Sequence, residues 1–192
     1  ADFTTGSPED LRASARLAES AEVKFVDVAI TGAIGLSGPR TPLLCAGTEV
    51  SELIDVLASI KAPIKEVGNK AGDAVSLKLL RSIFTKGLEA LSVECLMAAE
   101  KKGLRKELYE VLSDIDQSPI RDFMEVLVTS HVKHAVRRLK EVQEARVLIE
   151  SEEIQPLVLD GVEALFKRTA NAITEKAFEN AVTIENSLEW LF

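Results

Sequence analysis

Lys78 is the residue of this chain whose type and position most favour chemistry. Helical spacing places Arg81, Ser82 and Thr85 beside it on one polar stripe, near the start of a long predicted helix. A partly desolvated lysine can act as a general acid or base, because its pKa is lowered toward neutrality. Arg81 could bind a carboxylate or a phosphate through its fork of donors. Spacing by itself favours the alternative of a solvated helix face, since exposed lysines seldom have shifted pKa values.

Two loops could bring backbone and hydroxyl groups to a ligand. The stretch AITGAIGLSGPR (29–40) follows an apolar β-branched run, and its small residues would let a ligand approach the backbone at Thr31 and Gly32. The stretch TTGSP (4–8) could place Ser7 and the start of the next helix near an anion. Each loop also has a purely structural interpretation, the first as a glycine turn and the second as a capped helix start.

The histidines and cysteines indicate neither a metal site nor a disulfide. His131 and His134 are three residues apart on one predicted helix, but no third ligand follows in a recognisable pattern, so we expect surface or interface histidines. Cys45 and Cys95 lie far apart in apolar segments, which is typical of reduced core residues in an intracellular protein.

The composition excludes two classes of partner. The chain has 192 residues, of which 46% are hydrophobic and 28% charged, so it can bury a core. A net charge of -8 repels phosphate backbones, and the basic residues are dispersed among acids. No apolar run reaches membrane-spanning length, and the first residues lack the order of a signal peptide. We therefore expect a cytoplasmic protein that binds neither nucleic acid nor membrane.

The chain changes character near residue 70. Before it, two predicted helices (7–21 and 49–60) alternate with three predicted strands (24–32, 41–47 and 64–68), which indicates an α/β sheet packed by helices. After it the strand signals stop. Apolar residues then recur in steps of three and four, which predicts a helix over 74–102 that Gly103 ends: Leu77, Leu80, Phe84, Leu88, Leu91, Cys95 and Ala98.

Four further helices are predicted after Gly103, over 105–115, 118–150, 155–173 and 175–192. The sequence thus predicts two domains, an α/β domain over 1–70 and an all-helical domain over 71–192.

In this order, four segments resemble the β-hydroxyacid dehydrogenase superfamily, which includes 6-phosphogluconate and 3-hydroxyisobutyrate dehydrogenases. They are DFTTGSP (2–8), FVDVAITGAIGLSGPRTPLLCAG (25–47), GNKAGDAVSLKLLRS (68–82) and EALSVECLMAAEKKGL (89–104). The stretches KLLRSIFTKGLEAL and HAVRRLKEVQEA are similar to the C-terminal domain of one branch, the 6-phosphogluconate-dehydrogenase-like oxidoreductases. That branch carries an arginine where better-known members carry an asparagine.

The resemblance implies an NAD(P)-dependent oxidoreductase that transfers hydride between the nicotinamide of NAD or NADP and a small hydroxyacid-like substrate. It implies Lys78 as the catalytic acid/base and a position beside the nicotinamide for Thr5 and Ser7. It also implies an acidic substrate and a homodimer formed through the helical domain. The implied substrate-binding residues are Thr31, Gly32, Ala33, Arg81 and Ser82.

The sequence departs from the family pattern at three points. Ala33 stands where the family has a second glycine, and Arg81 and Ser82 replace paired asparagines. No G-x-G-x-x-G opens a βαβ unit, so residues 1–70 correspond to the C-terminal half of a Rossmann domain, and we expect a piece of a longer protein. The predicted fold is a partial Rossmann α/β domain followed by an all-α domain of the 6-phosphogluconate dehydrogenase type. The alternative function is a non-catalytic helical dimerisation or interaction module derived from that family.

Overall fold

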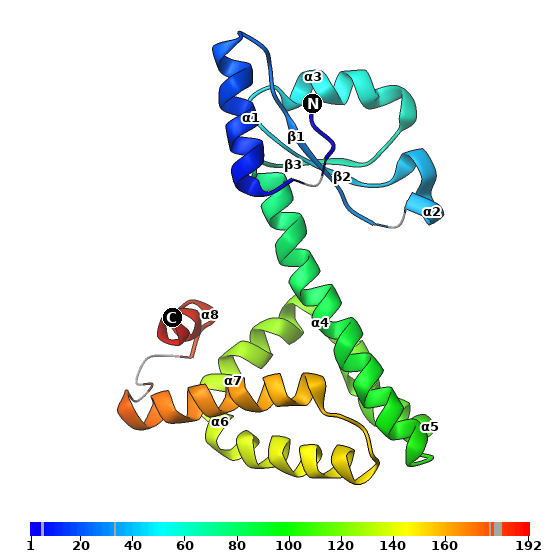
Figure 1. Ribbon diagram of the computed structural model, residues 1–192, viewed down its shortest axis with the longest axis vertical. Helices are drawn as coiled ribbons and strands as arrows, with labels where there is room; N and C mark the ends of the chain where they lie inside the picture. Colours follow the sequence, from blue (N-terminus) through cyan, green and yellow to red (C-terminus); the bar gives the residue numbers. More distant parts are fainter. Residues whose placement is uncertain (5, 33, 177, 179–181) are drawn as a thin grey trace. The chain divides into compact units, whose positions relative to one another are not determined.

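The computed structural model describes residues 1–4, 6–32, 34–176, 178 and 182–192 (Figure 1). The chain divides into two compact units, Ala1–Gly87 and Leu88–Phe192. This division falls inside the long helix α4 (Asp73–Lys101), whose first half belongs to unit 1 and whose second half belongs to unit 2. The strands that the structure describes all precede α4, as the sequence predicts.

Unit 1 is built on a three-stranded sheet in the order β1 (Asp27–Ile30), β2 (Leu43–Ala46) and β3 (Ile64–Gly68). β1 pairs antiparallel with β2, and β2 pairs parallel with β3. The three predicted strands are confirmed, and the first two are shorter than the apolar runs that predicted them. Because β1 runs opposite to β2 and β3, its carboxyl end opens at the edge of the sheet where β2 and β3 begin.

The outer edge of β1 pairs with the first residues of the chain. Asp2 lies opposite Asp27 in a parallel bridge. Its N–H donates to the Val26 carbonyl over 2.8 Å, and its carbonyl accepts from the Val28 N–H over 2.9 Å. Asp2 therefore extends the sheet at the outer edge of β1.

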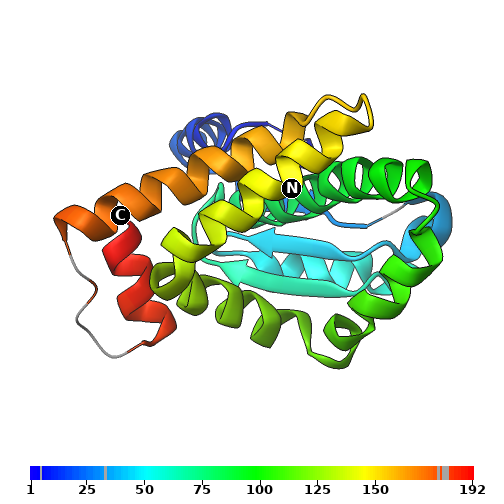
Figure 2. The same ribbon diagram turned by 90° about the horizontal axis from the view of Figure 1, so that it is seen from below.

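Different helices cover the two faces of the sheet. On one face α3 (Val50–Leu57) packs its Leu53 and Leu57 against a buried cluster, and it lies along the strands in Figure 2. On the other face the start of α4 places Ala74 against Ala29 and Ala46. Because side chains alternate along a strand, β1 and β2 supply both clusters, and their small residues let α4 approach the sheet closely. The α3 cluster consists of Val26, Val28, Leu43, Cys45 and Val50.

The sequence predicts two further helices of unit 1, and it treats the stretch that contains a third, short helix as a loop. α1 (Pro8–Ser20) begins with proline at its first position. A short helix, α2 (Ile34–Ser37), and a 3-10 turn (Gly38–Arg40) link β1 to β2. The helix predicted over 49–60 is confirmed, although its last turn, Ala58–Ile60, is a 3-10 helix.

The described residues of unit 2 form helices and the turns that connect them, and none of them lies in a strand. After α4 the chain turns at Gly103, which has the left-handed φ of +68° that favours glycine. Then follow α5 (Arg105–Val111), a 3-10 helix (Leu112–Gln117), α6 (Ile120–Ser151), α7 (Leu157–Glu175) and α8 (Ile184–Leu191). None of the helices in the described part of the chain has both the length and the apolar character needed to cross a membrane.

The single helix predicted over 175–192 is wrong in extent. α7 ends at Glu175, and Lys176 has extended backbone angles. A new helix starts only after Thr183, whose side chain accepts from the Asn186 N–H over 3.2 Å as an N-cap. Residues 177 and 179–181 of the predicted helix lie outside the described residues. The sequence pattern predicted one continuous helix here because apolar residues continue on both sides of Thr183, and the periodicity alone does not identify Thr183 as an N-cap.

Two polar groups hold α7 to its neighbours. Glu94 of α4 is buried, and its carboxylate accepts from the Val158 N–H over 2.7 Å and from the Leu159 N–H over 3.0 Å, at the start of α7. His131 of α6 is half-buried, with its Nε2 2.8 Å from the Thr169 hydroxyl oxygen on α7. Burial, together with nearby arginines, lowers the pKa of His131. His131 is thus a packing residue, whereas His134 is exposed.

The apolar stripe predicted for α4 is only partly covered, since Phe84 and Cys95 are half-buried and Ala98 is buried. Ala74 is buried in unit 1 and Ala98 in unit 2. Between them, four residues of the stripe are 41–61% exposed: Leu77, Leu80, Leu88 and Leu91. The helix is therefore as predicted, but much of the middle of its apolar face is left uncovered by the described residues.

Candidate functional site

The loop after β1 and the first turns of α4 line one cavity of about 340 Å³ in unit 1. The sequence singled out five of its lining residues from two segments more than 40 positions apart. Two apolar side chains, Ile30 and Ile34, complete the wall. The five predicted residues are Thr31, Gly32, Lys78, Arg81 and Ser82.

The loop wall of this cavity is fixed by its own backbone. The Thr31 N–H donates to the Pro42 carbonyl over 2.9 Å, and the Thr31 hydroxyl donates to the same oxygen over 3.2 Å. Gly32 has a φ of +114°, which side-chain-bearing residues rarely adopt. The glycine is thus needed for the turn, and the Thr31 oxygen keeps lone pairs with which to accept a hydrogen bond.

The helix wall carries the polar stripe of α4. Lys78 and Ser82 are half-buried, and Arg81 is exposed. The Ser82 hydroxyl donates to the Lys78 carbonyl over 3.0 Å, so Ser82 can accept but not donate a further bond in this rotamer. The cavity therefore joins an amine, a guanidinium and two hydroxyl oxygens.

Asp27 fixes the helix wall relative to the loop wall, and sequence analysis did not identify it. Its Oδ2 accepts from the Gly72 N–H over 2.9 Å and from the Val75 N–H over 3.3 Å, at the start of α4. Asp27 also begins β1, the strand whose other end carries Thr31. One strand therefore anchors both walls. The available signal was a lone acid inside an apolar run, KFVDVAI, where a surface position is the more common explanation.

Asp27 is completely buried, and its Oδ1 has no hydrogen-bond partner among the described residues. This burial raises the pKa of the Asp27 carboxyl, while the N–H donors of Val75 and Gly72 act in the opposite direction. The neighbouring turn is tightly packed as well: a Cβ on Gly72 would lie 2.8 Å from the Pro8 carbonyl oxygen.

The other predicted site residues stand apart from this cavity or outside the described residues. Thr5 and Ala33 fall among the undescribed positions. Ser7 caps α1, since its hydroxyl oxygen accepts from the Asp10 N–H over 3.1 Å, and its own N–H donates to the Asp10 carboxylate over 3.3 Å. Its side chain thus has the role that the capped-helix alternative assigns to it.

The donor set suits a small polar substrate. A dinucleotide's pyrophosphate instead needs a glycine-rich turn at a helix N-terminus, and the sequence contains no G-x-G-x-x-G. Ser7 and Asp10 already satisfy the start of α1. Among the described residues, no group of three or more histidine, cysteine or acidic side chains could hold a metal ion.

The chain matches a family model and a relative of known sequence. Residues 99–169 match the family model described as a domain of unknown function, DUF1932. A relative from Methanothermus fervidus, an uncharacterized 28.5 kDa protein from a 7S RNA 5′ region, is 34% identical over 146 residues. That match covers 76% of this chain and 57% of the relative, so the chain spans little more than half of the relative's length.

Solved structures share the fold at low sequence identity. An imine reductase from Aspergillus terreus superposes with a TM-score of 0.75 at 18% identity, over 99% of this chain and 68% of that one. An imine reductase from Myxococcus stipitatus, solved with NAD+, gives a TM-score of 0.74 at 16% identity over the same shares. A conserved hypothetical protein from Sinorhizobium meliloti is 24% identical, with a TM-score of 0.51, over 99% of this chain and 64% of that one.

Proposed function

We propose that this chain, which carries a DUF1932 domain on the fold of the imine reductases, is the substrate-binding part of an NAD(P)-dependent oxidoreductase. The resemblance to 6-phosphogluconate-dehydrogenase-like proteins is confirmed in the fold and in that domain. The observation that carries the proposal is the cavity between β1 and α4, because it joins Lys78 to Thr31 and Gly32.

In this proposal Lys78 moves the proton that accompanies hydride transfer. When bound, NAD or NADP would supply the hydride donor or acceptor. In the oxidation direction the Lys78 Nζ accepts the proton of the substrate hydroxyl as its carbon–oxygen bond becomes a carbonyl, and it returns that proton in the reduction direction. The half-buried position of Lys78 in the cavity wall, together with Thr31, supports this role.

The remaining cavity residues would bind and orient a small acidic substrate. Arg81 can pair with a carboxylate through two parallel N–H donors. The Thr31 oxygen can accept a hydrogen bond from a second polar group of the substrate, and the positive φ of Gly32 keeps that wall free of a side chain. We assign Ser82 and Ala33 to the same substrate and Thr5 and Ser7 to the cofactor, as the resemblance implies.

The names of the solved relatives suggest a second reaction for the same cavity, the reduction of a carbon–nitrogen double bond. Those proteins are named imine reductases and reductive aminases. A protonated Lys78 could donate to the nitrogen of a carbon–nitrogen double bond as it does to a carbonyl oxygen. Arg81 in the cavity wall favours the hydroxyacid, because an imine without a carboxylate gives the guanidinium no partner.

The test compares turnover of NADPH and NADH by the longer protein with hydroxyacids, ketoacids and cyclic imines. Lys78→Ala should lower kcat by about a hundredfold or more while the fold is retained. The matched control is Lys86→Ala, two turns further along α4 and outside the cavity, which should turn over like the parent. Equal turnover by parent and Lys78→Ala would refute the role of Lys78.

The alternative is a non-catalytic helical module that works by association, and a homodimer is proposed in both cases. The supporting observation is the uncovered middle of α4, where Leu80 is 61% and Ile83 is 72% exposed. A mostly apolar cavity of about 480 Å³ in unit 2 adds to it. Sedimentation of Leu80→Asp should show a monomer where the parent is a dimer. Binding of NADPH decides between the two functions, because only the oxidoreductase requires it.

We also propose a cytoplasmic location. It is supported by Cys45 and Cys95, both of which are free thiols in the structure.

A further inference from the structure

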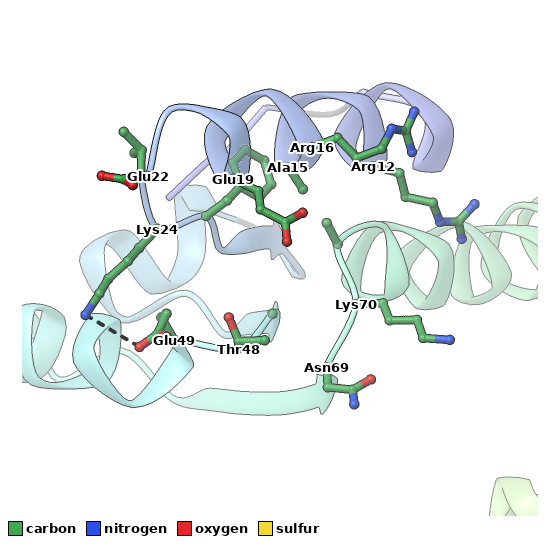
Figure 3. A pocket seen from close by; sticks show the side chains of 14 residues that line it. Arg12, Ala15, Arg16, Glu19, Glu22, Lys24, Thr48, Glu49, Asn69 and Lys70 are labelled. Carbon is green, nitrogen blue, oxygen red and sulfur yellow. Dashed lines mark ion pairs between the residues drawn. The ribbon is translucent and has the colours of Figure 1, made fainter.

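A second cavity in unit 1 lies between α1 and the turns that follow β2 and β3 (Figure 3). We name it the α1 cavity. Its volume is about 570 Å³, which is within the range of small-molecule sites. Its polar lining comes from three separate segments, and it includes Arg12, Arg16, Lys24, Thr48, Asn69 and Lys70.

Three cations of the α1 cavity have no acidic partner among the described residues: Arg12, Arg16 and Lys70. Four arginines elsewhere in the described part of the chain pair with acids, among them Arg137 with Glu141 and Arg146 with Asp160. Arg12 and Arg16 are four residues apart on α1, where like charges repel and weaken a helix. The lining holds four cations and three acids, Glu19, Glu22 and Glu49, so it has a small excess of positive charge in a chain with eight more acids than bases.

Three of the four cations lie on one side of the cavity and two of its three acids on the other, with Glu19 between them. Figure 3 shows Arg12, Arg16 and Lys70 on the side toward α4, and Lys24, Glu22 and Glu49 on the opposite side. Lys24 already pairs with Glu49, with its Nζ 3.6 Å from Oε2. An anion would therefore bind at the Arg12 side, and its charge would have to be compact, because the acids on the far side repel an extended polyanion.

The basic side is assembled by contact between α1 and the turn before α4. A Cβ on Gly72 would lie 3.2 Å from the Arg12 Nε, so Arg12 lies against the turn that also carries Lys70. Two guanidinium groups and one ammonium can donate to a phosphate from different directions, and arginine does so through a planar fork. The Asn69 amide and the Thr48 hydroxyl are further donors in the lining.

The α1 cavity is separate from the cavity of Lys78. It opens where β1 begins and β2 and β3 end, and its lining includes Phe25 and Gly47. The Lys78 cavity opens where β1 ends, at Ile30 and Thr31. The length of β1 alone separates them by about 10 Å. A ligand of the α1 cavity would therefore not be the substrate on which Lys78 acts.

We infer that the α1 cavity binds a small molecule bearing a phosphate or pyrophosphate group, held by Arg12, Arg16 and Lys70. The test is calorimetric titration of inorganic pyrophosphate into the 192-residue chain at low salt. We expect saturable binding of one pyrophosphate per chain. In the double variant Arg12→Gln/Arg16→Gln the affinity should fall by about tenfold or more.

The matched control is Lys61→Gln/Lys65→Gln, which removes the same charge from unit 1 outside the α1 cavity. Its affinity should stay within about twofold of the parent's, because screened charges outside the site act weakly. A third variant, Glu19→Gln, should bind more tightly, since it removes a like charge from the lining. Thermal unfolding of each variant checks that it is folded.

Two outcomes would overturn the inference. One is equal loss of affinity in both double variants, which would mean attraction by overall charge alone. The other is the absence of saturable pyrophosphate binding by the folded parent up to about 10 mM, a concentration that would detect even a weak specific site.

Discussion

Replacing Asp27 by alanine tests whether one buried carboxylate anchors the helix that carries Lys78. The change removes the acceptor of the Gly72 and Val75 N–H groups, both of which are buried. A buried donor left without a partner costs about 1–3 kcal/mol. Part of this is offset because the parent buries a carboxylate whose Oδ1 has no described partner. The free energy of unfolding should therefore fall by about 2–4 kcal/mol.

The matched variant is Asp27→Asn, which keeps an oxygen acceptor in the same place without the charge. It should lose less than half as much stability as Asp27→Ala. Because burial raises the pKa of Asp27 above its ordinary 3.8, the native state holds this proton more tightly than the unfolded state. The stabilisation that protonated Asp27 gives the parent is thus complete below pH 3.8, and it is lost as the pH rises through the native pKa of Asp27. Asparagine does not titrate, so Asp27→Asn does not lose this stabilisation. The free energy of unfolding of Asp27→Asn, relative to the parent, should therefore rise as the pH increases from 3.8 through the native pKa of Asp27.

The assay is urea unfolding followed by circular dichroism, combined with hydrogen exchange at the Gly72 and Val75 amides. Exchange at these two amides should accelerate in Asp27→Ala more than in Asp27→Asn. The reasoning is refuted if Asp27→Ala is as stable as the parent, or if the two variants lose stability equally and exchange alike.

Three further predictions concern groups described above. Burial lowers the pKa of His131, so unit 2 should lose stability as the pH falls from 6.5 through the lower native pKa of His131. In thermal melts the unfolding temperature should fall less over this pH range in His131→Gln than in the parent, and as much as in the parent in His134→Gln. Glu94→Ala should cost about 2–4 kcal/mol in urea unfolding, because the Val158 and Leu159 N–H groups lose a charged acceptor, and a cost below about 0.5 kcal/mol would contradict that role. Gly72→Ala should destabilise by more than about 1 kcal/mol, since its φ is +93° and the Pro8 oxygen is 2.8 Å from the added Cβ, whereas Gly87→Ala in the open middle of α4 should stabilise by up to about 1 kcal/mol.

Local signals in the sequence were sufficient for most elements of the fold. The proline start of α1, the glycine end of α4 and the β-branched runs of the sheet depend on neighbouring residues only, and all three were predicted correctly. The break before α8 was missed because the Thr183 cap competes with an apolar pattern that continues across it. Whether the apolar face of α4 is covered depends on tertiary contacts, which periodicity does not report.

The candidate site was predictable in part. Helical spacing placed Lys78 with Arg81 and Ser82, but only the family resemblance joined them to Thr31 and Gly32. Neither helical spacing nor the family resemblance identified the role of Asp27, because that role arises from long-range hydrogen bonds to Gly72 and Val75. The cations of the α1 cavity were likewise missed, since Arg12 and Lys70 are 58 positions apart and their proximity is a product of folding.

The antiparallel pairing of β1 with β2 has a consequence for ligand binding. Because one strand of the sheet is inverted, the carboxyl ends of its strands face two opposite edges, and each edge has its own cavity. Occupancy of one cavity then leaves the other sterically accessible. A phosphate compound at Arg12 and a substrate at Lys78 would form a ternary complex with the protein, and neither would displace the other in a competition experiment.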